Sequence, residues 1–379
     1  MVGRERNILG ESYFNSIIRE QVLCVLEKNG MNLCDKTYEN EVSKKVSLGQ
    51  KIWHTTIKEA ISADLFEYCE SKIKKGRGFY KLENIPRYAA FGYDFCKWFS
   101  RLIGAPRNIS EELAAIGALL NSYAALFDKI CDDYVVFFPI LVSRITRPAL
   151  SSATMIVNKS QKKFFAVKED DAPLIKMTIL LMEEYFKKCE KIHGSLLNKK
   201  TRTIFKNTIF NLYESELRSV DLKFSSKFNK TEVFRILRNK SSMLIWMMAL
   251  QCLLGVGANL NDGYVKLKKA ILELGDVFWI LDDIVDATED FMNGKWSYLS
   301  LKFDLAYSLK NYRPGDRPLI LDTMINRGAV VSSAEAMCMK YHGVEKAIED
   351  SIKRDFDYDI IFLPWLHMWV DSLVGTAAA

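Results

Sequence analysis

The chain has 379 residues, of which 49% are hydrophobic and 26% charged, and its 53 lysines and arginines against 47 aspartates and glutamates give a net charge of +6. These proportions are those of a globular protein with a sizeable core, which excludes a disordered or fibrous chain. The positive excess is spread along the chain without a basic tail, so we expect no nucleic-acid partner.

The order of apolar residues predicts helices along most of the chain. No proline falls within residues 1–85 or 174–311, so both stretches can stay helical without interruption. Asn108 and Glu111 stand at N-cap and capping-box positions before the first periodic row. Apolar residues recur at three- and four-residue steps in three rows: Leu113, Ile116, Leu120 and Ala124; Val233, Ile236, Leu237, Leu244, Met247 and Met248; and Leu267, Ile271, Leu274 and Phe278.

One segment favours a strand, and three read as loops. YVVFFPILV, residues 134–142, is the strand candidate, and its proline argues against a place inside a sheet. Glycine, proline and charge predict loops at residues 74–87, 157–173 and 310–318. None resembles a flexible linker, so we predict an all-α fold: a single domain over residues 1–379, with ten or more helices around a central apolar cavity.

We expect a cytoplasmic protein without a membrane span. The N-terminal residues lack the apolar run of a signal peptide, and the eight cysteines lie too far apart for a CxxC site. His54, His193, His342 and His367 are isolated, which gives a zinc site little support. Residues 241–261 are uncharged, but a helix apolar on all sides also fits the centre of a large bundle.

The strongest chemical signal is DDIVDATED, which places five carboxylates within residues 282–290, directly after an apolar run. Asp282, Asp286 and Asp290 stand at i, i+4 and i+8, so on a helix they share one face, and the same row continues backward through Phe278 and Leu274. Like charges on a core-facing row repel one another, and their removal from water adds to the free-energy cost of folding. This pattern predicts a bound hard divalent cation, Mg²⁺ above all.

A second, weaker acidic cluster lies earlier, in FDKICDDY. Asp128 and Asp132 again stand at i, i+4 and again extend an apolar row. Two helices could therefore present facing carboxylate pairs at one mouth of an apolar bundle. A solvated helix end is the alternative interpretation of this pair.

Positive residues lie near the second cluster. Lys240 interrupts an apolar row, which favours binding of a phosphate, although a lysine can also extend its ammonium group to solvent. Lys295 follows Gly294 just past the acids, with the same two alternatives. For Arg235 and Arg238, a place on the surface is at least as well supported as binding of a phosphate.

These residues resemble motifs of the class I isoprenoid synthase superfamily, all-α bundles that include chain-elongating prenyltransferases and terpene cyclases. FDKICDD is similar to the first aspartate-rich motif, with Lys129 where many members have a second Asp. DDIVDATEDFMNGK resembles the second motif of prenyltransferases, with its Gly-Lys, and also fits the cyclase version, which often has Asn, Ser/Thr and Glu at these three places. Lys240-Ser241 resembles the Lys-Thr of the prenyltransferase diphosphate site. The resemblance spans residues 109–303.

The resemblance implies a Mg²⁺-dependent enzyme with three bound ions and a prenyl diphosphate substrate, and it allows a homodimer. The implied catalytic residues are Asp128, Asp132, Asp282 and Asp286. The implied metal ligands are these four and Asp290. The implied diphosphate contacts are Lys240, Lys295 and Arg235, and the implied cavity residues are Phe127, Trp246, Phe278 and Trp279.

One departure separates the branches of the superfamily. Chain-elongating members carry an Arg-Arg pair soon after the first motif, whereas here Asp132 is followed by DYVVFFPILVSR, with Arg144 the first basic residue. The sequence therefore favours a terpene cyclase that ionises geranylgeranyl or farnesyl diphosphate, cyclises the carbocation and releases diphosphate. Aromatic rings could stabilise that cation, although a ring on an apolar row is also ordinary core. The alternatives are a prenyltransferase, a head-to-head condensing enzyme and a non-catalytic helical scaffold.

Overall fold

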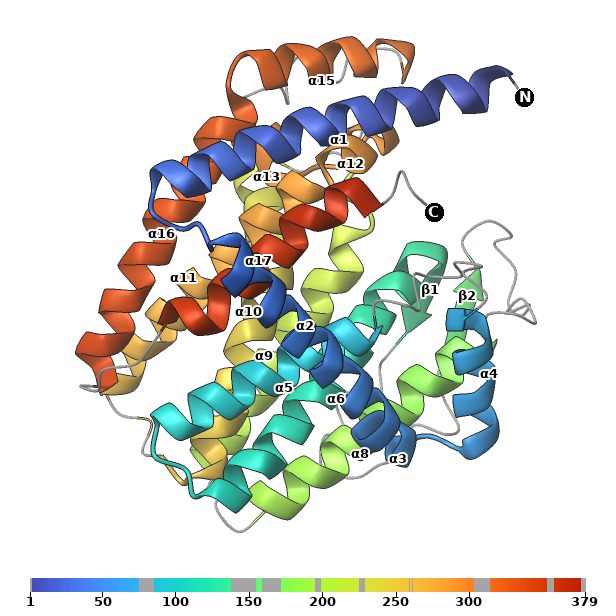
Figure 1. Cartoon of the computed structure of the whole chain (residues 1–379). Coiled ribbons are helices and arrows are strands. Elements are labelled where there is room, and N and C mark those ends of the chain that lie inside the picture. Colours follow the sequence, from blue (N-terminus) through green and yellow to red (C-terminus); the bar gives the residue numbers. More distant parts are fainter. Residues whose placement is uncertain are drawn as a thin grey trace. The chain divides into compact units, whose positions relative to one another are not determined.

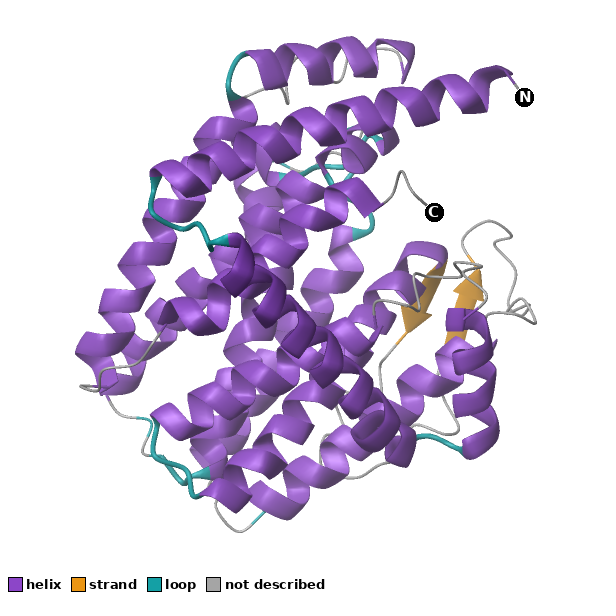
Figure 2. Ribbon diagram, in the orientation of Figure 1, coloured by secondary structure: helices purple, strands orange, loops and turns teal. Residues whose placement is uncertain are grey.

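The computed structural model describes residues 2–74, 85–137, 155–158, 172–194, 199–224, 229–258, 260, 262–302, 314–352 and 358–375. Apart from one short strand pair, the regular structure in these ranges is helical (Figure 2). Figure 1 labels the α-helices and strands, and two short helices, η1 and η3, complete the elements along the chain. They are α1 (Val2–Lys28), α2 (Asp35–Ile52), the π-helix η1 (Trp53–Ile57), α3 (Lys58–Ala60), α4 (Ala63–Lys74), α5 (Ile85–Leu102), α6 (Arg107–Asp133), β1 (Tyr134–Phe137), β2 (Met155–Asn158), α8 (Ala172–His193), α9 (Lys199–Ser219), α10 (Lys230–Gly255), α11 (Asp262–Val285), α12 (Ala287–Asn293), α13 (Tyr298–Lys302), the 3-10 helix η3 (Pro314–Asp316), α15 (Arg317–Asn326), α16 (Ala329–Ile352) and α17 (Tyr358–Gly375).

The chain forms two compact units whose sequences interleave. The first contains Met1–Tyr38, Arg218–Ile245 and Val265–Ala379, and the second contains Glu39–Leu217 and Trp246–Tyr264. The boundaries between the units fall inside helices α2, α9, α10 and α11. A single domain over residues 1–379 stays a prediction.

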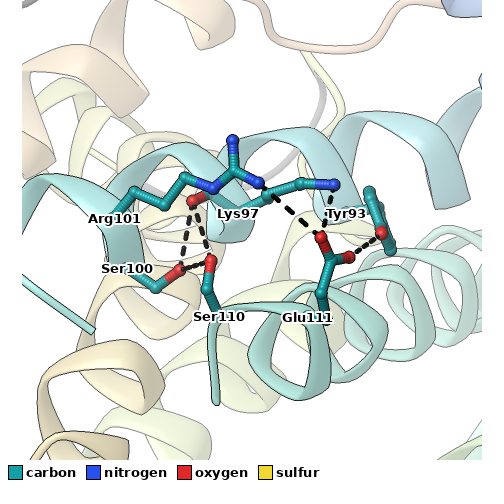
Figure 3. A network of polar contacts seen from close by, with 6 residues as sticks. All are labelled: Tyr93, Lys97, Ser100, Arg101, Ser110 and Glu111. Atoms are coloured by element: carbon teal, nitrogen blue, oxygen red, sulfur yellow. Dashed lines mark hydrogen bonds and ion pairs between the residues drawn. The ribbon is translucent and has the colours of Figure 1, made fainter. Parts of the chain in front are cut away.

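In the second unit, α6 packs against α5 and α8. The backbones of α5 and α6 meet at two glycines: a Cβ atom on Gly92 would lie 2.2 Å from the carbonyl oxygen of Gly117. Hydrogen bonds and ion pairs also join these two helices where α6 begins (Figure 3). There the Lys97 ammonium group lies 2.7 Å from the Glu111 carboxylate, and Tyr93 donates a hydrogen bond to the same carboxylate. The predicted capping box is therefore wrong: α6 begins at Arg107, and Glu111 binds side chains of α5.

In the first unit, α1 packs against α12, α15, α16 and α17, and Figure 1 shows it running alongside α15. Arg19 in α1 forms an ion pair with Asp371 in α17 at 2.7 Å. Helices α10 and α11 approach closely, since a Cβ atom on Gly275 would lie 2.5 Å from the Cα atom of Ser242. The buried Asp276 carboxylate next to Gly275 then accepts a hydrogen bond from the Ser242 hydroxyl at 2.7 Å.

The three periodic rows lie on α6, α10 and α11, and nearly all of their residues are buried, which confirms the predicted helices. Residues 245–254 of α10 are buried throughout. None of the helices in the described ranges is long and apolar enough to cross a membrane.

The strand prediction is confirmed for its first four residues. β1 pairs antiparallel with β2, with Tyr134 opposite Asn158 and Phe137 opposite Met155. The rest of residues 134–142 lies outside the described residues. The loop predicted at 157–173 begins too early, because residues 157 and 158 pair as strand. It also ends too late, because residues 172 and 173 already belong to α8.

Two other predicted loops are wrong in part, for one physical reason. Residues 85–87 belong to α5, and residues 314–318 form η3 and the start of α15. Proline lacks an N–H group, but the first turn of a helix has no partner for that group, so proline is well suited to a helix start. Residues 75–84 and 303–313 lie outside the described ranges.

Candidate functional site

The acids of the second cluster lie where α11 meets α12. Helix α11 ends at Val285, and Asp286 precedes α12 with φ −87° and ψ 4°. The helical hydrogen bonds nevertheless continue across this break, from the Asp286 N–H to the Asp282 carbonyl at 2.8 Å and from the Asp290 N–H to the Asp286 carbonyl at 2.9 Å. Asp282, Asp286 and Asp290 therefore follow one another at one-turn steps, as their spacing predicted. We call these three residues the acidic row.

The charges of both predicted lysines act on Asp290. Burial raises the pKa of the Asp290 carboxyl to about 7, the charges of Lys295 and Lys240 act in the opposite direction, and Glu289 and Asp282 raise it further. Lys240 lies half-buried in α10, and Lys295 lies half-buried just past α12. The structure thus brings the acidic row together with Lys240 and Lys295, which come from separate parts of the first unit.

The position of Lys295 is fixed by its backbone. Gly294 ends α12 with a left-handed φ of 69°, and the Lys295 N–H donates to the Asp290 carbonyl at 2.8 Å, as at many glycine-ended helices. The Phe224 N–H binds the Gly294 carbonyl at 2.8 Å, and the Trp296 N–H binds the Leu222 carbonyl at 3.1 Å. These bonds hold the Gly-Lys segment against residues 222–224.

Arg317 is a basic residue beside this segment that sequence reasoning missed. Its guanidinium donates to the carbonyl of Met292, near the end of α12. A Cβ atom on Gly294 would lie 2.7 Å from the Arg317 Nη2 atom. Position 294 therefore needs glycine for its φ angle, and a larger residue there would also displace the end of the Arg317 side chain. No signal in the sequence pointed to Arg317, because it fell in a predicted loop.

Asp283 is not part of the acidic row, and its carboxylate binds the protein backbone. Its buried carboxylate accepts the backbone N–H of Tyr298, the first residue of α13. Burial raises the pKa of this carboxyl well above its usual range, and the neighbouring charge of Asp290 adds to the effect. Asp283 thus joins α11 to α13.

Of the predicted cavity residues, Phe278 and Trp279 are buried beside the acidic row in α11. Phe278 packs against Phe362 and Trp369 of α17, and Trp279 against Phe234 and Tyr298. Phe127 and Trp246, in the second unit, are also buried and pack against Tyr213 and Tyr264. That these four rings line a substrate cavity stays a prediction.

The two arginines of α10 differ in their exposure and in their contacts. Arg235 is exposed, and its predicted contact with diphosphate stays a prediction. Arg238 donates to the Asp276 carboxylate at 2.8 Å, and the Lys340 ammonium group lies 3.0 Å from the same carboxylate. No sequence pattern indicated this buried acceptor.

The first acidic cluster lies at the end of α6. Asp128 is half-buried and comes directly after buried Phe127. Asp132 belongs to the last turn of the helix, but its side chain lies outside the described residues. The helical i, i+4 placement of the pair is confirmed, and its part in metal binding stays a prediction.

The acidic row suits a hard cation in its donor chemistry. Carboxylate oxygens are ligands that Mg²⁺ prefers, and burial together with neighbouring acids raises the pKa values of Asp283 and Asp290, which a bound cation would lower again. Among the described residues, no group of three or more His, Cys, Asp or Glu side chains is placed so that it could hold a metal ion without further ligands. Mg²⁺ usually takes one or two carboxylates and completes its shell with water and phosphate oxygens, so an open acidic row fits it.

Comparison with known proteins gives structural relatives only. No protein-family model and no curated protein matches the sequence. Solved structures match over nearly the whole chain. Geranylgeranyl pyrophosphate synthase from Lactobacillus brevis is 13% identical, with a TM-score of 0.54, over 88% of this chain and 97% of that one.

Two further structures match equally broadly. Geranylgeranyl pyrophosphate synthetase from Pyrococcus horikoshii is 14% identical with a TM-score of 0.53, over 89% of this chain and 98% of that one. A decaprenyl diphosphate synthase from Rhodobacter capsulatus is 14% identical with a TM-score of 0.52, over the same shares. At such identities the likeness establishes the fold. The chain therefore has the all-helical fold of the isoprenoid synthases, as its motifs predicted.

Proposed function

We propose that the chain is a Mg²⁺-dependent enzyme that acts on allylic prenyl diphosphates, and that it transfers the prenyl group to a second prenyl diphosphate. The observation that carries the proposal is the acidic row at the end of a core helix, with the charges of Lys240 and Lys295 acting on its last member. Proteins of the same fold that are named geranylgeranyl and decaprenyl diphosphate synthases support transfer over the cyclisation favoured by the sequence.

Each group has a separate task in this proposal. Bound Mg²⁺ would neutralise the diphosphate as it leaves the allylic carbon. The carboxylates of the acidic row would hold the metal, and Asp128 and Asp132 of the second unit stay predicted ligands. Lys240 and Lys295 bind diphosphate oxygens and stabilise the charge that develops there; a unit-charge pair at 4 Å contributes about 4 kcal/mol at an effective dielectric of 20. Several such pairs together supply a useful part of a catalytic barrier.

Cyclisation of a single prenyl diphosphate is the second candidate. Where chain-elongating enzymes carry their arginine pair, this chain continues from Asp133 into β1, and residues 134–137 include no basic side chain. A cyclase binds one diphosphate and needs fewer cations than an enzyme that binds two. The missing cations are the specific observation in favour of this candidate.

Product analysis tests both candidates. Geranyl, farnesyl, geranylgeranyl and geranylfarnesyl diphosphates are each incubated with the protein and Mg²⁺, with and without isopentenyl diphosphate. A longer prenyl diphosphate, formed only when isopentenyl diphosphate is present, supports transfer. A hydrocarbon or alcohol formed without it supports cyclisation. A product that joins two allylic substrates would indicate head-to-head coupling. No product and no released diphosphate under any condition contradicts the proposal.

Variants assign the reaction to the acidic row. Asp286→Asn removes one carboxylate charge at similar volume, and we expect a loss of activity of 100-fold or more, on the order of the ~10²–10³ found for lost electrostatic stabilisation. Glu289→Gln is the matched control, because Glu289 lies in the same segment but is exposed and off the row. It should retain wild-type activity. Equal activity in both variants would remove Asp286 from the site.

A further inference from the structure

We propose that Trp369 is a positioning residue for the metal site: its indole N–H holds the Asp282 carboxylate in the orientation that binds the cation. This inference rests on the proposed function, since it concerns the first member of the acidic row. The carrying observation is a hydrogen bond of 3.1 Å from the Trp369 Nε1 atom to the Asp282 Oδ1 atom, between residues 87 positions apart.

The indole ring contacts two successive turns of α11. Its N–H binds Asp282, and its ring packs against Phe278, with centroids 6.0 Å apart. Phe278 and Asp282 are four residues apart, so they lie one above the other on the same face of the helix. Phe362, seven residues before Trp369, packs against the same Phe278 ring at 6.1 Å. One face of α17 therefore packs against one face of α11 at the point where the apolar row of α11 is followed by the acidic row.

Helix α17 is itself held in place close to Trp369. Asp371, two residues further on, accepts hydrogen bonds from Arg19 Nε at 3.2 Å and Nη2 at 2.7 Å, and from the Tyr38 hydroxyl. His367, two residues before, makes a hydrogen bond through Nε2 to the Met31 carbonyl at 3.0 Å. The N-terminal residues of the chain thus fix the part of α17 that carries the indole.

An indole N–H is well suited to this task. It is a donor only and carries no charge, so it can orient a carboxylate without competing with a cation for that carboxylate's negative charge. Hydrogen bonds from outside the ligand set commonly fix the orientation of metal ligands, and their removal typically weakens metal binding about 10- to 100-fold. The apolar contact with Phe278 restricts the rotamer of the indole, which gives the donor a fixed direction.

The hydrogen bond can be tested without metal by NMR of protein labelled with ¹⁵N in its tryptophan indoles. The Trp369 signal is identified by its loss in Trp369→Phe. We expect Asp282→Ala to shift this signal and to speed the exchange of its proton with water, while the signal of Trp365, one turn earlier in α17, stays in place. A Trp369 signal that does not respond to loss of the carboxylate overturns the inference.

The effect on metal binding is tested with Mn²⁺ and inorganic pyrophosphate as probes, with binding measured by electron paramagnetic resonance. Trp369→Phe keeps an aromatic ring and removes the N–H, so we expect Mn²⁺ affinity to fall about tenfold. Trp365→Phe is the matched control, with the same substitution on the same helix, and should leave the affinity unchanged. Thermal denaturation checks that both variants are folded.

Activity gives a third readout that loss of fold would not mimic. In Trp369→Phe the Mg²⁺ concentration for half-maximal rate should rise about tenfold, and saturating Mg²⁺ should restore most of kcat. If the wild-type chain binds Mn²⁺ and Trp369→Phe binds it equally well, the inference is wrong and the proposed function stands. If the wild-type chain binds no Mn²⁺ even with pyrophosphate, the proposed function fails and the inference fails with it.

Discussion

Among single residues, Asp276 shows how a buried charge can join three helices. Its carboxylate in α11 accepts hydrogen bonds from Arg238 and Ser242 of α10 and from Lys340 of α16, at 2.7–3.0 Å. The Asp276 side chain is 4% exposed, whereas those of Arg238 and Lys340 are 37% and 36% exposed. Solvent therefore screens the two cations in part, and the network is weaker than a fully buried one.

Asp276→Asn should lower the free energy of unfolding by about 2 kcal/mol. Loss of one partner from a fully buried ion pair costs about 3–5 kcal/mol, and the exposure of both cations reduces that value. Urea denaturation measures the change. Lys269→Ala is the control, because its ion pair with Glu273 is exposed and 4.0 Å long, and it should change stability by less than about 0.5 kcal/mol. Similar losses in the two variants would contradict the role of Asp276.

His193 gives a prediction for pH. Its ring is buried in the second unit, with Nε2 at 2.9 Å from the Gln251 carbonyl, and burial lowers its pKa from 6.5 to about 4. Between these pH values the unfolded chain binds the extra proton and the folded chain does not. The stability contribution is therefore present above pH 6.5 and is lost as pH falls toward 4.

Comparison with His193→Gln isolates this effect, because glutamine keeps a donor and does not titrate. Between pH 7.5 and 5 the wild-type chain should lose about 2 kcal/mol more stability than the variant, as the linkage relation gives for this pKa change. Urea denaturation at both pH values provides the measurement. An equal loss in the two proteins would show that His193 titrates in the folded chain as it does in the unfolded chain.

At the scale of elements, the close approach of α10 and α11 depends on one glycine. A methyl group at position 275 would meet the Ser242 backbone at 2.5 Å, and backbone cannot move aside as a flexible side chain can. Gly275 also lies next to Asp276 and two turns before Asp282. The spacing of the two helices therefore affects both the buried ion network and the acidic row.

Gly275→Ala should destabilise the chain by about 2 kcal/mol, the usual size of an overpacking effect. Gly343→Ala in α16 is the matched control: its Cβ atom would meet nothing within 4 Å, so it should gain about 0.5–1 kcal/mol from helix propensity. Thermal and urea denaturation give both values. A Gly275→Ala variant as stable as Gly343→Ala would show that α10 and α11 can separate without cost.

The helices and the acidic row could be predicted because both depend on short-range spacing. Apolar residues at three- and four-residue steps located α6, α10 and α11, and the same steps placed Asp282, Asp286 and Asp290 on one face. The predictions were wrong at residues whose local sequence is compatible with two different structures. Proline near Arg317 suggested a loop but begins a helix, and Glu111 could have capped α6 but binds α5 instead.

Residues that act through distant contacts could not be found in this way. Trp369 meets Asp282 across 87 residues and Arg317 meets Met292 across 25, and no spacing rule connects such positions. Arg238 suggested a surface residue because its acceptor, Asp276, lies 38 residues away. Tertiary packing alone determines these pairs.

For the whole molecule, the near balance of 53 positive and 47 negative residues conceals a local concentration of carboxylates. The second cluster, both predicted lysines and Trp369 all belong to one compact unit, although they come from separate segments of the chain. The fold class followed from sequence, since helical periodicity covers most of the chain. The division into two interleaved units did not, because its boundaries fall inside helices and no change in composition marks them.

If the acidic row supports Mg²⁺-dependent cleavage of an allylic diphosphate, the protein releases inorganic pyrophosphate, and this release can be measured. Farnesyl and geranylgeranyl diphosphates are incubated with and without Mg²⁺ and isopentenyl diphosphate. We predict release with the wild-type chain and Mg²⁺, retention of this activity in Glu289→Gln, and its loss in Asp286→Asn or when Mg²⁺ is chelated. Release that continues unchanged in Asp286→Asn would exclude the acidic row from the reaction, and no release from the wild-type chain with either substrate would exclude the reaction itself.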